Sequence, residues 1–151
     1  MSYPGIIQPG GEPEASSLAT IATQGAAAAA GGATSGVLRT PTGTILTVKR
    51  QNQVVAAAGT DTAIVAAVTG KKIRVLAVDL DCAGTATVFT FNSKPAGAGA
   101  AIAGPYNEAI SEGKSLGYNP HGWFETVVSE GLSATTGAGS NTTVLLTYVE
   151  V

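Results

Sequence analysis

Alternating apolar residues between Lys71 and Phe91 constrain this chain more strongly than any other stretch of its sequence. The segment reads KKIRVLAVDLDCAGTATVFTF, and both alternate sets of positions in residues 72–81 contain apolar side chains. After a short break of small residues, Thr87, Phe89 and Phe91 share one face. Because β-branched and aromatic residues flank the break, the pattern predicts two strands that pair as an antiparallel hairpin, the first of them covered on both faces.

Short runs of the same kind continue along the chain and are separated by turn residues. The other predicted strands are residues 45–48, 53–58, 63–68, 106–110, 124–128, 132–135 and 143–151. The Gly- and Ala-rich segment 92–103 is predicted to be a loop. Many short strands with turn signals between them are typical of an all-β sandwich. We therefore expect an all-β fold, a jelly-roll-like antiparallel β-sandwich, over residues 45–151.

Residues 1–44 differ in composition from the rest of the chain, because prolines, glycines and an alanine run interrupt any regular apolar period. This segment is predicted to be an extended, low-complexity N-terminal arm with at most a frayed helix. A flexible linker is one interpretation of such a composition. An arm that becomes ordered on a partner is the other, because a spacer does not need apolar anchors. The predicted partner-contacting side chains are Tyr3, Ile6, Ile7, Leu18 and Ile21.

The surface of the predicted domain has unusually little charge. The chain has 151 residues, enough for one domain with a sizeable core. Only 12% of its residues are charged, compared with about 25% in an average soluble domain, and the mean hydropathy is +0.26. A freely diffusing monomer normally needs more charge to remain soluble. We therefore expect sister subunits or a larger partner to cover much of the surface.

Charge and cysteine content argue against several other classes of protein. The net charge is −2 and the basic residues form no cluster, so nucleic-acid binding is not expected. No apolar run is long enough to span a membrane, and the first basic residue is Arg39, so we expect neither a membrane anchor nor a secretory leader. The protein is expected to be made in the cytoplasm. Cys82 is the single cysteine and is predicted to be a small buried hydrophobe.

Groups that carry out catalysis are scarce in the sequence. His121 is the only histidine, and its position inside an Asn-Pro-His-Gly turn gives it no evident catalytic partner. Asp79 and Asp81 fall on one strand face, but two carboxylates are too few ligands for calcium. The glycines do not form a phosphate-binding loop, because no Gly-Lys-Ser/Thr follows them. We therefore predict no catalytic, cofactor-binding or metal-binding residues.

A turn followed by aromatic residues is the most distinctive local motif. Pro120 occupies the turn position that its fixed φ favours, and Trp123 directly follows the turn. The residues predicted to form a structural turn and an aromatic core are Asn119, Pro120, Gly122, Trp123 and Phe124. Core packing at the end of the sandwich is the preferred interpretation of the two rings. The alternative is a sugar-stacking platform that also includes Tyr118.

Three motifs together resemble small virion proteins of tailed bacteriophages, in particular capsid decoration or cement proteins. They are Lys72-Ile73-Arg74-Val75-Leu76, the segment Gly117-Tyr118-Asn119-Pro120-His121-Gly122-Trp123-Phe124-Glu125-Thr126, and Leu146-Thr147-Tyr148-Val149. The resemblance covers roughly residues 69–151 and is weak across the arm.

The resemblance implies a β-sandwich that trimerises on the outer capsid surface and bridges neighbouring major capsid subunits, without catalysis. The expected function is therefore that of a structural virion protein whose partners are itself, as a homotrimer, and the major capsid protein. A phage head-fibre or tail-associated module that binds a carbohydrate or receptor is the alternative.

Overall fold

The computed structural model describes residues 38–94 and 99–151 of the chain. Residues Leu38–Val151 form one compact unit by their contacts. The predicted arm residues Tyr3, Ile6, Ile7, Leu18 and Ile21 lie outside the described residues. Within the described part, no helix is long and apolar enough to cross a bilayer.

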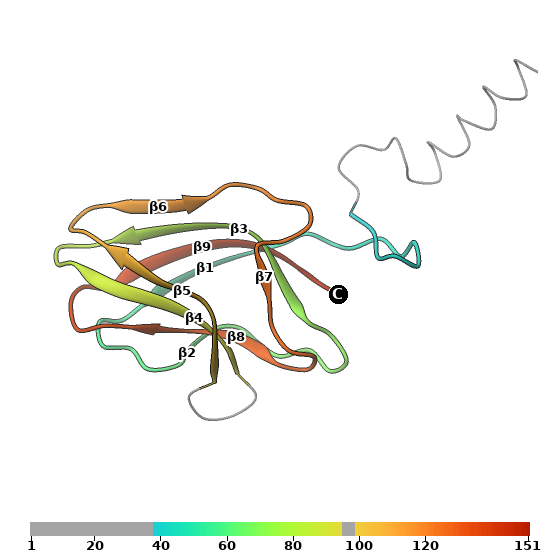
Figure 1. Ribbon diagram of the computed structural model, residues 1–151, viewed down its shortest axis with the longest axis horizontal. Helices are drawn as coiled ribbons and strands as arrows, with labels where there is room; N and C mark the ends of the chain where they lie inside the picture. Colours follow the sequence, from blue (N-terminus) through green and yellow to red (C-terminus); the bar gives the residue numbers. More distant parts are fainter. Residues whose placement is uncertain (1–37, 95–98) are drawn as a thin grey trace, which may run out of the picture. The chain divides into compact units, whose positions relative to one another are not determined.

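The described residues form β-strands and no helix (Figure 1). The strands are β1 Lys49–Val55, β2 Thr62–Val65, β3 Ile73–Cys82, β4 Thr87–Lys94, β5 Ala100–Glu108, β6 Gly113–Leu116, β7 Phe124–Glu125, β8 Gly131–Thr136 and β9 Thr142–Glu150. They make two antiparallel sheets, one with the order β1-β9-β3-β6 and the other with the order β2-β8-β4-β5, while β7 pairs with β3 beyond the end of β6. In both sheets, most neighbouring strands are far apart in the sequence. Within the described part, β4 and β5 are the only consecutive strands that pair with each other. This strand order is that of a jelly roll, and the prediction of an all-β antiparallel sandwich is confirmed.

The predicted hairpin between the strands of residues 71–91 is wrong. Both strands exist, but β3 pairs with β9 and β6, whereas β4 pairs with β5 and β8 in the opposite sheet. Residues 83–86 therefore carry the chain from one sheet to the other. A short break of small residues can form either a hairpin turn or a crossing between sheets. Pairing with distant strands, above all that of β3 with β9, determines which of the two forms.

The core lies between the two sheets and is built mainly from aliphatic and aromatic side chains. Phe89 and Phe91 are fully buried, with ring centroids 4.9 Å apart in an edge-to-face arrangement. The other fully buried large side chains of this cluster are Ile73, Val75, Val78, Val55, Leu132, Val144 and Leu146. These residues come from strands of both sheets, so the core holds the two layers together.

A register shift in β3 explains why both of its alternate sets are apolar. The pairing of β3 with β9 is irregular between Val75 and Ala77. Before the shift the buried residues have odd numbers, Ile73 and Val75. After it they have even numbers, Val78, Leu80 and Cys82. Asp79 and Asp81 are exposed on the other face. The prediction that the whole strand is covered on both faces is therefore wrong, and a β-bulge accounts for the pattern.

A smaller apolar cluster covers one end of the outer face of this sheet. Leu76, at the bulge, is buried with Val149 and Leu46, and Leu38 and Val151 pack against them. The backbone N–H of Leu46 donates to the carbonyl oxygen of Leu38 at 2.8 Å. The segment that leads into β1 thus belongs to the packed fold.

Several strand boundaries differ from those predicted, and β6 was not predicted as a strand. Residues 45–48 are not a strand, and the first strand begins at Lys49. The predicted loop 92–103 is mostly strand in its described residues, because β4 continues to Lys94 and β5 begins at Ala100. Since β5 is an edge strand and its first residues are exposed or partly exposed, alanine and glycine suffice there.

Candidate functional site

The turn of residues 119–122 lies at the edge of the first sheet, in the connection between β6 and β7. Both of these short strands pair with β3. The turn lies between them along the edge of β3, opposite the β-bulge. The backbone N–H of Asn119 donates to the carbonyl oxygen of Leu76 at 2.8 Å, and that of Trp123 donates to Val75 at 2.8 Å. The bulge therefore supplies two consecutive carbonyls that hold the turn against the sheet.

The turn is also held by hydrogen bonds within it, from its backbone and from the Asn119 side chain. The N–H of Gly122 donates to the carbonyl of Asn119 at 3.0 Å, which closes a four-residue turn with Pro120 at its second position. The Asn119 side chain accepts from the N–H of His121 at 3.0 Å and donates to the carbonyl of Gly122 at 2.8 Å. This turn is a rigid support for the residues beside it.

A cluster of charged side chains lies next to the turn. Glu125 on β7 accepts a hydrogen bond from Lys72 Nζ on one carboxylate oxygen, at 2.6 Å. Its other oxygen accepts from Arg74 Nη2 at 3.0 Å and from Arg74 Nε at 3.1 Å. The hydrogen bond from Lys72 and then that from Arg74 hold the pKa of Glu125 below its usual range, against the opposing effect of burial. Two cations against one carboxylate leave one positive charge at this place.

Trp123 lies outside the core, so the prediction that its ring packs in the core is wrong. The side chain is 49% exposed, and its Nε1–H donates to the carbonyl of Gly117 at 2.7 Å. Phe124 takes the inward position instead, with its ring centroid 5.0 Å from that of Phe91. Phe124 begins β7 and Trp123 directly precedes it, and consecutive side chains of an extended chain point to opposite sides, so Phe124 enters the core and Trp123 does not.

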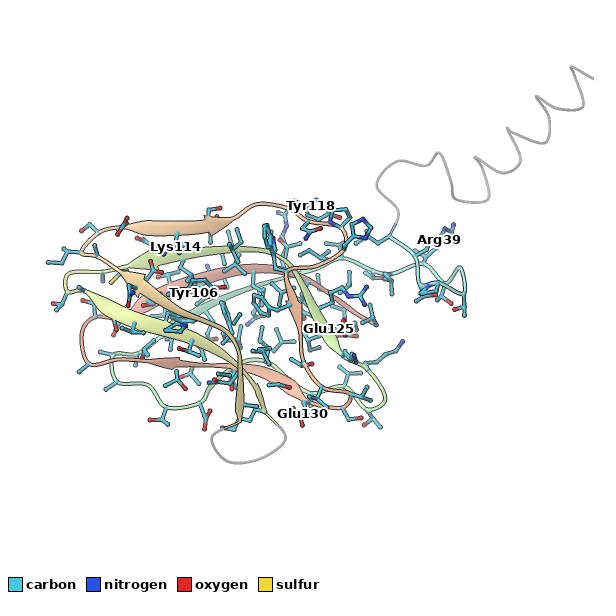
Figure 2. The ribbon with its side chains drawn as sticks, viewed as in Figure 1. Arg39, Tyr106, Lys114, Tyr118, Glu125 and Glu130 are labelled. Carbon is cyan, nitrogen blue, oxygen red and sulfur yellow. The ribbon has the colours of Figure 1, made fainter. Side chains whose placement is uncertain are left out.

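An open pocket joins these features. Its volume is about 230 Å³, and it is lined by Arg74, His121, Gly122, Trp123, Phe124 and Glu125. Tyr118, 56% exposed, lies on the same connection between β6 and β7 but does not line the pocket, and Figure 2 shows it well apart from Glu125 in this view. The pocket thus combines an exposed indole with hydrogen-bonding and charged groups.

Apolar side chains are also exposed on the outer face of the first sheet, a surface that we call the open face. Val54 is 54% exposed on β1 and Leu145 is 46% exposed on β9. Val54 pairs with Thr143, and Leu145 pairs with Asn52 and Asp79, so the two apolar side chains are near neighbours on adjacent strands. The described part of the chain covers the end of this face at Leu76 and Val149 but leaves the part around Val54 and Leu145 exposed.

A larger pocket of about 660 Å³ lies at the end of the second sheet. Its lining includes Ala86, Val88 and Ala138 with the carboxylates Glu108 and Glu112, but no histidine, cysteine or basic residue. The Glu108 carboxylate is buried without a hydrogen-bond partner in the described residues, and burial raises its pKa. Glu108 shares the inward face of its strand with Tyr106 and also lines this pocket.

Other residues singled out in the sequence have structural surroundings. Cys82 is buried, with its Sγ 3.2 Å from the carbonyl oxygen of Thr85. Asp79 and Asp81 are exposed on β3. In residues 38–94 and 99–151, no group of three or more His, Cys, Asp or Glu side chains is arranged to hold a metal ion.

Sequence reasoning missed the charged cluster beside the turn. Lys72 and Arg74 are two residues apart, a spacing that places both side chains on one face of an extended chain. That spacing was a usable signal, although their partner Glu125 is far away in the sequence.

No protein-family model matches this chain, and no curated protein matches it significantly. The residues themselves therefore have to carry any functional proposal.

Proposed function

We propose that this protein is a structural virion protein that binds the outer surface of a tailed-phage capsid. It acts as a homotrimer, bridges major capsid subunits and stabilises the shell, without catalysis or a cofactor. It is made in the host cytoplasm and resides on the virion. The resemblance of three sequence motifs to decoration proteins motivates this proposal.

The open face is the observation that carries the proposal. Val54 and Leu145 are about half exposed on a regular sheet that belongs to a chain with only 12% charged residues. Apolar area removed from water contributes about 25 cal/mol per Å². Contacts of this kind, repeated by each subunit of an oligomer, give strong attachment without one deep site.

The architecture supports the proposal only at the level of fold. Jelly rolls occur in viral capsid proteins and also in lectins. Function has to be argued from surfaces and sites rather than from the architecture. The fold therefore agrees equally well with shell binding and with glycan binding.

Co-sedimentation with capsids that lack this protein tests shell binding. The wild-type protein should saturate the capsids, and Leu145→Asp should weaken binding by about tenfold or more, because it replaces an apolar contact with a second carboxylate beside Asp79. Ile110→Asp is the matched control, since Ile110 is an exposed apolar residue in the turn between β5 and β6. Equal sedimentation of all three proteins would show that the open face is not the contact.

The oligomeric state is a separate measurement. Light scattering coupled to size exclusion should give the mass of three chains of 14.9 kDa each. A monodisperse monomer at micromolar concentration would contradict the trimer, and a dimer would contradict three-fold placement.

A glycan- or receptor-binding module of a head fibre or tail is the second candidate. The exposed ring of Trp123 favours it, since a large aromatic side chain outside the core is available for contact with a ligand. A glycan array should then show saturable binding that is lost in Trp123→Ala, with an unchanged circular dichroism spectrum.

A further inference from the structure

The indole of Trp123 is held in place before any ligand arrives. Its backbone N–H is bonded to Val75 in the sheet, and its side-chain N–H is bonded to Gly117 within the same connection. The ring nitrogen is therefore already satisfied, and the exposed part of the side chain is an apolar aromatic surface. A fixed aromatic surface loses little conformational entropy on binding.

The polar groups around this ring have spare hydrogen-bonding capacity. Arg74 uses Nε and Nη2 for Glu125, and its Nη1 has no hydrogen-bond partner in the described residues. The imidazole of His121 is likewise free of hydrogen bonds to the described part of the chain, where only its backbone N–H is bonded. An aromatic surface with donors and acceptors at its edge fits a pyranose ring, which has C–H groups on its faces and hydroxyl groups around its rim.

The charge at this place selects among saccharides. Lys72 and Arg74 share the single carboxylate of Glu125, which leaves one net positive charge in a chain whose overall charge is −2. Because Nε and Nη2 of Arg74 already bond Glu125, Nη1 is the charged donor that remains for a ligand, and a charged donor favours an anion over a neutral hydroxyl group.

We infer that the pocket beside Trp123 binds an acidic saccharide of the uronic acid type. The sugar ring lies against the indole, and its carboxylate lies near Arg74 and His121. This inference rests on the second candidate function, and it names the chemical class of the ligand. It is independent of shell binding through the open face.

Intrinsic fluorescence tests the inference directly, because Trp123 is the only tryptophan of the chain. Trigalacturonate is the probe, and its methyl ester is the control, because the ester keeps the sugar rings but replaces each carboxylate charge with a methyl ester group. Trigalacturonate should change the tryptophan emission saturably and bind about tenfold more tightly than the ester. Added salt should reduce this preference, because the charges are partly exposed.

Two variants locate the site by calorimetry. Trp123→Ala should weaken trigalacturonate binding by about tenfold or more, as removal of a central aromatic contact does. Leu145→Ala is the control, because it removes an exposed apolar side chain from the open face. It should bind like the wild-type protein.

Each outcome is decisive. Absence of a saturable response to trigalacturonate, or full binding by Trp123→Ala, overturns the site. Equal affinity for the acid and its ester overturns the acidic ligand but leaves a glycan-binding module standing. Preferential binding of the acid, lost in Trp123→Ala and kept in Leu145→Ala, supports the inference.

Discussion

Gly122 lies directly against the side chain of Arg74. A Cβ atom at position 122 would come within 2.5 Å of Arg74 Cγ and 2.8 Å of its Cδ, and the φ angle of Gly122 is +84°. The absence of a side chain therefore lets the turn approach β3 while Arg74 extends to Glu125. The turn and the charged cluster are parts of one structural unit.

Gly122→Ala should destabilise the protein by about 1–3 kcal/mol, because alanine is strained at this φ and collides with Arg74. Urea unfolding measures the change. Gly117→Ala is the control, since nothing lies within 4 Å of the Cβ it would add, and it should have little effect. Equal stability of Gly122→Ala and the parent would show that the turn moves away from Arg74 at no cost.

Trp123→Ala should cost only about 1 kcal/mol of stability, which is the value of the hydrogen bond from its indole to Gly117. Phe91→Ala should cost about 3–5 kcal/mol, because it removes a fully buried ring. Thermal unfolding of the two variants compares them. A loss in Trp123→Ala as large as in Phe91→Ala would mean that the indole is buried in solution, for example by another subunit.

Ser93→Ala should destabilise the end of the sandwich near β7. The buried Ser93 hydroxyl donates to a carboxylate oxygen of Glu130 and accepts from the N–H of Val127 at 2.8 Å. Its removal leaves both partners without this bond, at a cost of about 1–3 kcal/mol in urea unfolding. Ser115→Ala, on the exposed side of β6, should be nearly neutral. Similar midpoints for the two variants would contradict a structural role for Ser93.

Acid should weaken the protein partly through Glu125. The pKa of this group is lower in the folded protein than in the unfolded chain, mainly because of Lys72 and then Arg74. Its ion pairs therefore contribute stability above the unfolded pKa, and the contribution disappears as the pH falls through the folded pKa. Since the side chains are about one-third exposed, solvent screening limits the effect to about 1 kcal/mol or less.

Glu125→Gln should lower stability near neutral pH and flatten its dependence on pH below the unfolded pKa. Urea midpoints measured across the acidic range compare the variant with the parent. Parallel pH curves for the two proteins would show that Glu125 titrates normally in the folded state.

A chain that begins at Leu38 should keep the stability of the full-length fold, because Leu38–Val151 is a compact unit. A chain that begins at Thr47 loses Leu38 and Leu46 and exposes Leu76 and Val149 to water. It should be less stable by about 1.5–3 kcal/mol, the value of burying one large apolar side chain. Equal urea midpoints of the two shortened chains would show that this outer cluster contributes nothing.

Local patterns predicted the strands better than their partners. Alternation identified β3, β4 and β9, because side chains of a strand face opposite sides regardless of what lies beside it. The pairing of β3 with β9 depends on contacts between distant parts of the chain, which no local pattern encodes. The bulge at Leu76 moves the inward-facing positions of β3 from odd to even residue numbers. One buried face therefore looked in the sequence like two apolar faces.

The candidate site was predictable only in part. The turn at Asn119-Pro120-His121-Gly122 follows from its own residue types. The position of the Trp123 ring does not, because Trp123 and Phe124 are both apolar and either could have faced the core. The partnership of Arg74 with Glu125 required the register of β3 with β7.

The place of β9 between β1 and β3 sets the order in which this protein can be assembled. Lys49 pairs with Tyr148 and Ile73 pairs with Glu150. Neither neighbour of β9 can complete its ladder on a ribosome until residues 142–150 have emerged. Contacts so distant in sequence are slow to form, and β1 and β3 keep bare edges meanwhile. During synthesis, the growing chain is therefore open to premature association through those edges.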